Sequence, residues 1–166
     1  MYKYKDREFN SLIQPIVEIE EFQKTKNIKH HGLTRYDHSR RVAYFSYLVT
    51  KFLRLDYKET TEAAMLHDFF TTEVENENAI LKLRRHPNHA VENSQKYFNL
   101  SDKQVDIIKT HMFPVTFTPP KYLESVIVDL VDDVCSIYER ISATTCEVSY
   151  TTMVVISMIT NFIKFL

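Results

Sequence analysis

Glycine is almost missing from this chain of 166 residues, since Gly32 is the only one. Tight hairpins and phosphate-cradling loops depend on glycine, because it adopts left-handed backbone conformations at little steric cost. The scarcity argues against a β-rich fold and excludes a Walker-type or dinucleotide-binding loop. Any phosphate chemistry in this protein must therefore use side chains and metal ions.

The chain also has few cysteines, no large excess of positive or negative charge, and few long apolar runs. Cys135 and Cys146 form no Cys-x-x-Cys pair, which favours free thiols and a cytoplasmic protein. The formal net charge of −1 predicts no nucleic-acid surface. Residues 1–10 lack the apolar core of a signal peptide, and the apolar run 153–166 is too short to span a bilayer. We therefore expect no membrane association.

Aromatic residues and helical periodicity dominate what is present. The 11 Phe and 10 Tyr can fill much of a core. Apolar residues recur at steps of three and four, and Thr34 and Ser101 each begin a motif that resembles a capping box. With no repeat and no linker, we expect one all-α domain over 1–166, a bundle of six to seven helices. The expected helices cover about 9–24, 34–52, 57–68, 87–98, 101–111, 121–141 and 149–165.

Four polar residues interrupt the apolar stripes of these helices. His38 opens one inward stripe, His67-Asp68 ends the apolar run 63–66, and Asp132 lies within another stripe. A buried carboxylate costs several kcal/mol unless a cation accompanies it. Two imidazoles and two carboxylates in one core would suit Mn, Fe, Co, Ni or Zn.

Asp129 and Asp133 compete with Asp132 for the ligand position. They lie four residues apart and share a helix face that Asp132 does not. The apolar stripe through Val128 and Cys135 favours Asp132.

The order His38, His67-Asp68, Asp132 resembles the signature of the HD phosphohydrolase superfamily. The segment YDHSRRVAYFSYLV looks like the family's first-histidine helix, and EAAMLHDF resembles its HD segment. ESVIVDLVDDVCSIYE is similar to the helix of the last aspartate, with Asp132 in the ligand position. The resemblance covers about residues 31–140. It implies an HD-type helical bundle in which Asp68 and His67 act in catalysis on a phosphoester or phosphoanhydride, with a metal-activated water.

Two more histidines match an extended, two-metal form of the family. In such relatives, two histidines between the HD pair and the last aspartate bind a second ion, and the HD aspartate bridges both ions. His86 and His111 occupy these places here, and Asp68 would bridge. Read without the family, His86 could be a helix cap and His111 a core residue. The resemblance implies one or two divalent transition metal ions, with Fe, Mn, Zn, Co and Ni all open.

The chain departs from the family at one cationic position. Many HD enzymes carry a lysine a few residues after the HD pair, whereas Phe69-Phe70-Thr71-Thr72 follows it here. A cation that binds substrate phosphate must therefore come from elsewhere, and for each candidate the alternative is a solvated surface charge. The candidates are Arg35, Arg41, Arg84, Arg85 and Lys109.

The resemblance implies a small phosphorylated substrate, in particular a nucleotide or dinucleotide. Two other functions stay open: an HD domain that binds a nucleotide or partner without turnover, and a di-iron oxygenase on the same scaffold. No motif reads a base or a sugar, so the sequence leaves the substrate open. The apolar C-terminal segment allows for a homodimer.

Overall fold

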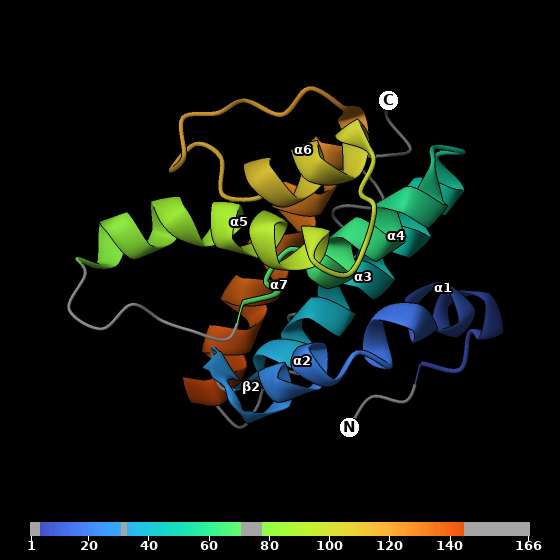
Figure 1. Cartoon of the computed structure of the whole chain (residues 1–166), viewed down its shortest axis with the longest axis horizontal. Coiled ribbons are helices and arrows are strands. Elements are labelled where there is room, and N and C mark those ends of the chain that lie inside the picture. Colours follow the sequence, from blue (N-terminus) through green and yellow to red (C-terminus); the bar gives the residue numbers. More distant parts are fainter. Residues whose placement is uncertain (1–3, 31–32, 71–77, 145–166) are drawn as a thin grey trace.

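The computed structural model describes residues 4–30, 33–70 and 78–144. Helices account for most of this part of the chain, which confirms the predicted all-α class (Figure 1). The helices are α1 (Arg7–Val17), α2 (Glu20–Gln23), α3 (Arg35–Phe52), α4 (Tyr57–Leu66), α5 (Ala79–Gln95), α6 (Asp102–Thr110) and α7 (Leu123–Thr144). Among the described helices, none combines the length and apolarity needed to cross a membrane.

Helix α3 is the central element of the bundle. It packs against both α4 and α7, while α6 contacts α4, α5 and α7, and α1 lies against α4 (Figure 1). The start of α3 meets the end of α7 through His38 and Glu139, and the residues after α3 meet the start of α7 through Asp56 and Glu124. The two helices therefore run antiparallel, which brings side chains far apart in sequence into one core.

The two capping motifs that the sequence predicted, at Thr34 and Ser101, both lie at the start of a helix. The Thr34 hydroxyl accepts a hydrogen bond from the Asp37 backbone N–H at 3.1 Å, at the start of α3. At the start of α6, Ser101 and Gln104 form a reciprocal capping box, with bonds of 3.1 and 3.0 Å. Each cap satisfies backbone donors that the first helical turn leaves open, a contribution of about 1 kcal/mol.

The end of α3 shows how a chain with so little glycine stops a helix. Arg54 adopts the left-handed conformation, with φ of 58°. The N–H of Leu55 bonds the carbonyl of Thr50 at 2.9 Å, and the N–H of Arg54 bonds that of Lys51 at 3.2 Å. This is a Schellman motif, in which glycine usually takes the left-handed position.

Helix boundaries differ from expectation in two places. The predicted helix 9–24 divides into α1 and the short α2, followed by a 3-10 turn, Lys24–Asn27. Helix α5 begins at Ala79 rather than at Pro87, so the predicted start was wrong. A proline inside a helix keeps a helical φ and costs one backbone hydrogen bond, so the preceding turns can persist.

A two-residue ladder was not expected. β1 (Lys29–His30) pairs antiparallel with β2 (Leu33–Thr34) just before α3. The backbone of His30 pairs with that of Leu33 in this ladder. The expected helix 149–165 lies outside the described residues.

The core is rich in aromatic rings, as the composition predicted. Phe9, Tyr47, Phe22 and Phe69 are all fully buried. The rings of Phe22 and Phe69 meet edge to face, with centroids 5.2 Å apart, and those of Phe9 and Tyr47 are 5.7 Å apart. Such pairs contribute about 0.5–1.5 kcal/mol beyond the area they bury. The first pair joins α2 to the segment after α4, and the second joins α1 to α3.

Candidate metal centre

Six imidazole and carboxylate side chains meet where α3, α4, α5, α6 and α7 converge. Five of these residues are buried and the sixth, His86, is half-buried. Two of the helices contribute residues immediately after their last turn. The set is His38 on α3, His67 and Asp68 after α4, His86 on α5, His111 after α6 and Asp132 on α7.

Asp132 is the meeting point of one half of this cluster. Its Oδ1 lies 2.8 Å from Nε2 of His38 and 3.7 Å from Nε2 of His67. His67 Nε2 is also 4.0 Å from Oδ2 of Asp68. The sequence analysis predicted these four residues as core metal ligands, and the structure brings their side chains together.

Asp68 connects this half to a second one. Its other oxygen, Oδ1, lies 3.6 Å from Nε2 of His86 and 3.9 Å from Nε2 of His111. The two Nε2 atoms are themselves 2.9 Å apart. Because its two oxygens face different histidine sets, Asp68 has the placement that a bridging carboxylate requires.

Backbone carbonyls fix the orientation of two imidazole rings. Nδ1 of His67 lies 2.7 Å from the Ala64 carbonyl, and Nδ1 of His111 lies 2.6 Å from the Ile108 carbonyl. A carbonyl oxygen only accepts, so each Nδ1 carries the proton and each Nε2 is left to act as a ligand atom.

One buried nitrogen atom, Nε2 of His67, indicates that the cluster fits a metal ion. Within the part of the chain that the structure describes, Nε2 of His67 is buried and has no hydrogen-bond partner. Such an atom is costly in a protein core, and a cation among the neighbouring carboxylates would satisfy it. The residues present therefore fit a divalent metal ion.

Electrostatics favour ligand-competent protonation states over most of the cluster. Burial, together with repulsion from His67 and His86, lowers the pKa of His111 to about 3. Burial also lowers the pKa of His86. Although burial opposes ionisation of Asp132, the neighbouring His67 and His38 hold its pKa below the usual range. Neutral imidazoles and ionised carboxylates are the forms that bind metal.

His38 carries a contact that sequence reasoning missed. Its Nδ1 donates to Oε2 of Glu139 at 2.8 Å, and Oε1 of Glu139 accepts from Arg41 at 2.8 Å. Burial disfavours the His38 cation, but hydrogen bonds to Asp132 and Glu139 outweigh it and raise the pKa of His38 to about 10. Glu139 follows Asp132 by two helical turns, and that spacing was the signal available in the sequence.

Arg35 is the predicted cation that lies beside the cluster. Its Nε is 3.9 Å from Oδ2 of Asp68, and its Nη1 donates to the Phe70 carbonyl at 2.8 Å. The guanidinium also lies over the Phe70 ring at 3.8 Å, and that ring stacks on His86 at 5.4 Å. Arg35, Phe70 and His86 thus form one side of the site.

The other predicted cations are placed elsewhere. Arg41 pairs with Glu139 behind His38. Arg84 bonds the Val115 carbonyl at 3.1 Å, and Arg85 and Lys109 are exposed. The partners of Arg41 and Arg84, Glu139 and the Val115 carbonyl, are not members of the His/Asp cluster.

The three aspartates of α7 that the sequence offered for the cluster, Asp129, Asp132 and Asp133, lie in different surroundings. Asp132 faces His38, whereas Asp133 is exposed. Asp129 is buried next to the backbone of Phe113, and burial together with repulsion from Asp133 and Asp132 raises the pKa of Asp129 to about 7. The structure therefore places Asp132, and neither neighbour, in the cluster.

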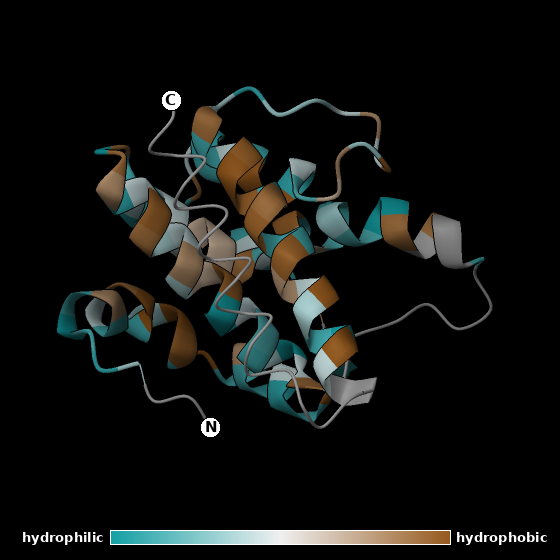
Figure 2. Cartoon of the chain, turned by 180° about the vertical axis from the view of Figure 1, so that it is seen from behind, coloured by the Kyte–Doolittle hydropathy of each residue, from teal (hydrophilic) through white to brown (hydrophobic). Residues whose placement is uncertain are grey.

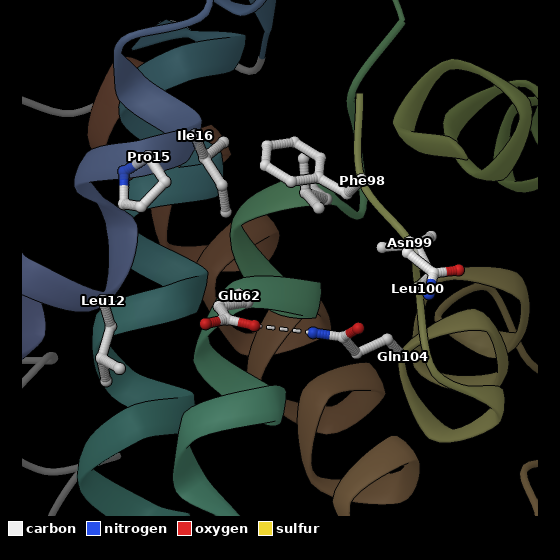
Figure 3. Close-up of a pocket in the computed structure, with 9 residues that line it drawn as sticks. Leu12, Pro15, Ile16, Glu62, Phe98, Asn99, Leu100 and Gln104 are labelled. Carbon is white, nitrogen blue, oxygen red and sulfur yellow. Dashed lines mark hydrogen bonds between the residues drawn. The ribbon is translucent and has the colours of Figure 1, made fainter. Parts of the chain in front are cut away.

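A cavity of about 160 Å³ lies apart from the cluster, between α1, α4 and the α5–α6 connection (Figure 3). Leu12, Ile16 and Phe98 give it apolar walls, and Gln104 donates to Glu62 across it at 2.8 Å. None of the six clustered residues lines it, so it is a separate feature.

Comparisons with known proteins agree with this arrangement. The HD domain family matches residues 35–136, which is more than half of the chain and contains all six clustered residues. Comparisons with curated proteins and with solved structures give no match. The buried His/Asp cluster lies within the matched region, and the chain belongs to the HD domain family.

Proposed function

We propose that this protein is a divalent-metal-dependent phosphohydrolase. One observation carries the proposal: four imidazole Nε2 atoms and two carboxylates face one buried volume, with the oxygens of Asp68 divided between two histidine sets. The family match supports the same chemistry, because HD domains are mostly metal-dependent hydrolases.

The two halves of the cluster define which residues would hold the ions. His38, His67, Asp68 and Asp132 would hold one ion, and Asp68, His86 and His111 would hold a second. When bound, divalent ions supply the Lewis acidity that polarises a phosphoryl oxygen and lowers the pKa of water toward neutrality. The mixed nitrogen and oxygen donors accept several metals, so Mn, Fe, Co, Ni and Zn all belong in the metal screen.

Arg35 supplies a fixed positive charge at the side of the site formed with Phe70 and His86. Its contacts with the Phe70 carbonyl and ring hold the guanidinium in place before substrate arrives. Guanidinium groups bind phosphate through paired donors, and a preorganised charge stabilises negative charge that develops during reaction. We infer that Arg35 does the work of the lysine that other HD enzymes carry after the HD pair.

We infer a small phosphorylated substrate, with nucleotides and dinucleotides as the first candidates. The overall charge of −1 offers no attraction to a long polyanion, which supports a small substrate over a nucleic acid. The side chain of His86 is 15% exposed, which is the largest exposed fraction among the six clustered side chains. Substrate would therefore approach the site from the side of His86.

The test combines metal analysis with a hydrolysis screen. The protein, loaded with each metal in turn, should hydrolyse at least one member of a panel of nucleotides, cyclic dinucleotides and dinucleoside polyphosphates. Asp68→Asn should lose metal and at least about a hundredfold in turnover. Asp133→Asn, a matched change of an exposed aspartate, should keep both.

The other outcomes point to the two alternative functions. Metal and nucleotide binding without turnover by any loaded form would identify a binding domain. Retained iron with an oxygen-dependent change in the optical spectrum, and no phosphate release, would identify an oxygenase. Full metal content in Asp68→Asn would contradict the assignment of the site itself.

A further inference from the structure

The cavity between α1, α4 and the α5–α6 connection combines apolar walls with a carboxylate. Leu12 and Ile16 of α1, Leu66 of α4 and Phe98 supply apolar surface. Among the described residues that line the cavity, Glu62 of α4 is the one ionisable side chain. Figure 3 shows Glu62 among Leu12, Ile16 and Phe98. The lining therefore suits a ligand with an apolar body and one polar end.

The apolar wall follows from the pattern of α1, and the cavity is open to small molecules. Leu12 and Ile16 are four residues apart, so they lie on the same side of α1, whose apolar residues are brown among hydrophilic ones in Figure 2. Ile16 and Leu66 are buried, whereas Pro15 and Asn99 are exposed. The cavity therefore reaches from the surface into the core.

The volume of the cavity, about 160 Å³, limits the size of a ligand. An apolar cavity of about 150 Å³ accepts a molecule the size of benzene. An aromatic ring of that size could meet the ring of Phe98 edge to face, the arrangement that aromatic pairs favour. A nucleotide is much larger, so this cavity cannot be a second copy of the phosphate site.

The charge of Glu62 selects the polar end of the ligand. Nε2 of Gln104 donates to Oε2 of Glu62 at 2.8 Å, which leaves Oε1 to accept from a ligand. Burial raises the pKa of Glu62, the bond from Gln104 opposes this, and the nearby carboxylates of Glu59 and Asp56 raise it further. No cation of the described chain forms an ion pair with Glu62. An ammonium group would supply the opposite charge, and a charge-assisted hydrogen bond is about twice as strong as a neutral one.

We propose that this cavity binds a small organic ammonium ion, whose N–H groups donate to Glu62 and whose apolar body packs on Ile16 and Phe98. The ionised carboxylate disfavours an anion, and a neutral alcohol donates without adding charge. Leu66 lines the cavity and directly precedes His67, so the ligand would pack against the helix that leads into the metal centre.

Binding of benzylammonium to the full-length protein, followed by NMR, tests the proposal. Its roughly eight non-hydrogen atoms can supply a Kd of about 1 mM or tighter. Benzyl alcohol has the same shape without the charge and should bind at least about tenfold more weakly. Nuclear Overhauser contacts from the bound ring should reach the methyl groups of Ile16 and Leu66.

Glu62→Gln removes the charge and keeps an oxygen that accepts from Gln104. Both probes should bind this variant equally, and its retained binding of benzyl alcohol shows that the cavity survives. Glu92→Gln is the matched control, because the side chain of Glu92 on α5 is 68% exposed and does not line the cavity. It should keep the full preference for benzylammonium.

Four results would overturn the proposal. Benzylammonium could fail to bind, the two probes could bind the unchanged protein equally, or the preference could survive Glu62→Gln. The bound ring could also contact residues outside the cavity. Each result is independent of metal content and of hydrolysis, because none of the six clustered residues lines the cavity.

Discussion

Replacing Glu139 should weaken metal binding although Glu139 is not a proposed ligand. Its carboxylate accepts from Nδ1 of His38 at 2.8 Å, which leaves Nε2 of that ring directed at Asp132. Loss of a partner that orients a metal-binding histidine costs about 10- to 100-fold in metal affinity. Glu139→Gln keeps an acceptor and removes the charge, so we expect about a tenfold loss, near 1.4 kcal/mol. Glu139→Leu removes both and should approach a hundredfold.

The assay is competition for Zn²⁺ or Mn²⁺ against a chromophoric chelator. Glu124→Gln is the matched control, because Glu124 is also a buried acid of α7 that pairs with a cation, Lys103, at 3.0 Å. The metal affinity of Glu124→Gln should equal that of the unchanged protein. Arg41→Leu combined with Glu139→Leu separates orientation from the cost of an unpaired Arg41, since it removes both charges. Unchanged affinity in Glu139→Gln, or an equal loss in Glu124→Gln, would refute the reasoning.

Three further predictions concern other parts of the molecule. Replacing His86 and His111 together by alanine should halve the metal content measured by elemental analysis, whereas His89→Ala should not; equal content in both would indicate a single ion. Arg54→Gly should raise the melting temperature by about 2–4 °C, because the left-handed conformation costs a side chain about 1 kcal/mol; no rise would mean that Arg54 is not strained. The ion pair with Lys51 and the Tyr57 hydroxyl hold the pKa of Glu8 at about 2, below its ordinary 4.5. The melting-temperature difference between the unchanged protein and Glu8→Gln should therefore be full above pH 4.5 and vanish as the pH falls toward 2; a difference that persists at pH 2 would contradict this.

Local pattern was enough to predict the fold class and most of the helices. Capping at Thr34 and Ser101 depends on contacts between residues three apart, which the sequence displays directly. The amphipathic stripes likewise depend on steps of three and four within one helix. The start of α5 was mispredicted because Pro87 can begin a helix or lie inside one, and local sequence does not distinguish the two.

The six His and Asp residues that cluster could also be predicted from the sequence, because polar residues interrupt apolar stripes in an order that resembles a known family. What stayed open was the surroundings of those residues. The sequence offered five cationic residues as candidates for binding substrate phosphate and did not distinguish between them. Packing places Arg35 beside Asp68, whereas Arg41 pairs with Glu139. The contact between His38 and Glu139 joins residues 101 positions apart. Such contacts are set by how α3 and α7 pack, and no pattern within either helix encodes which side chains then meet.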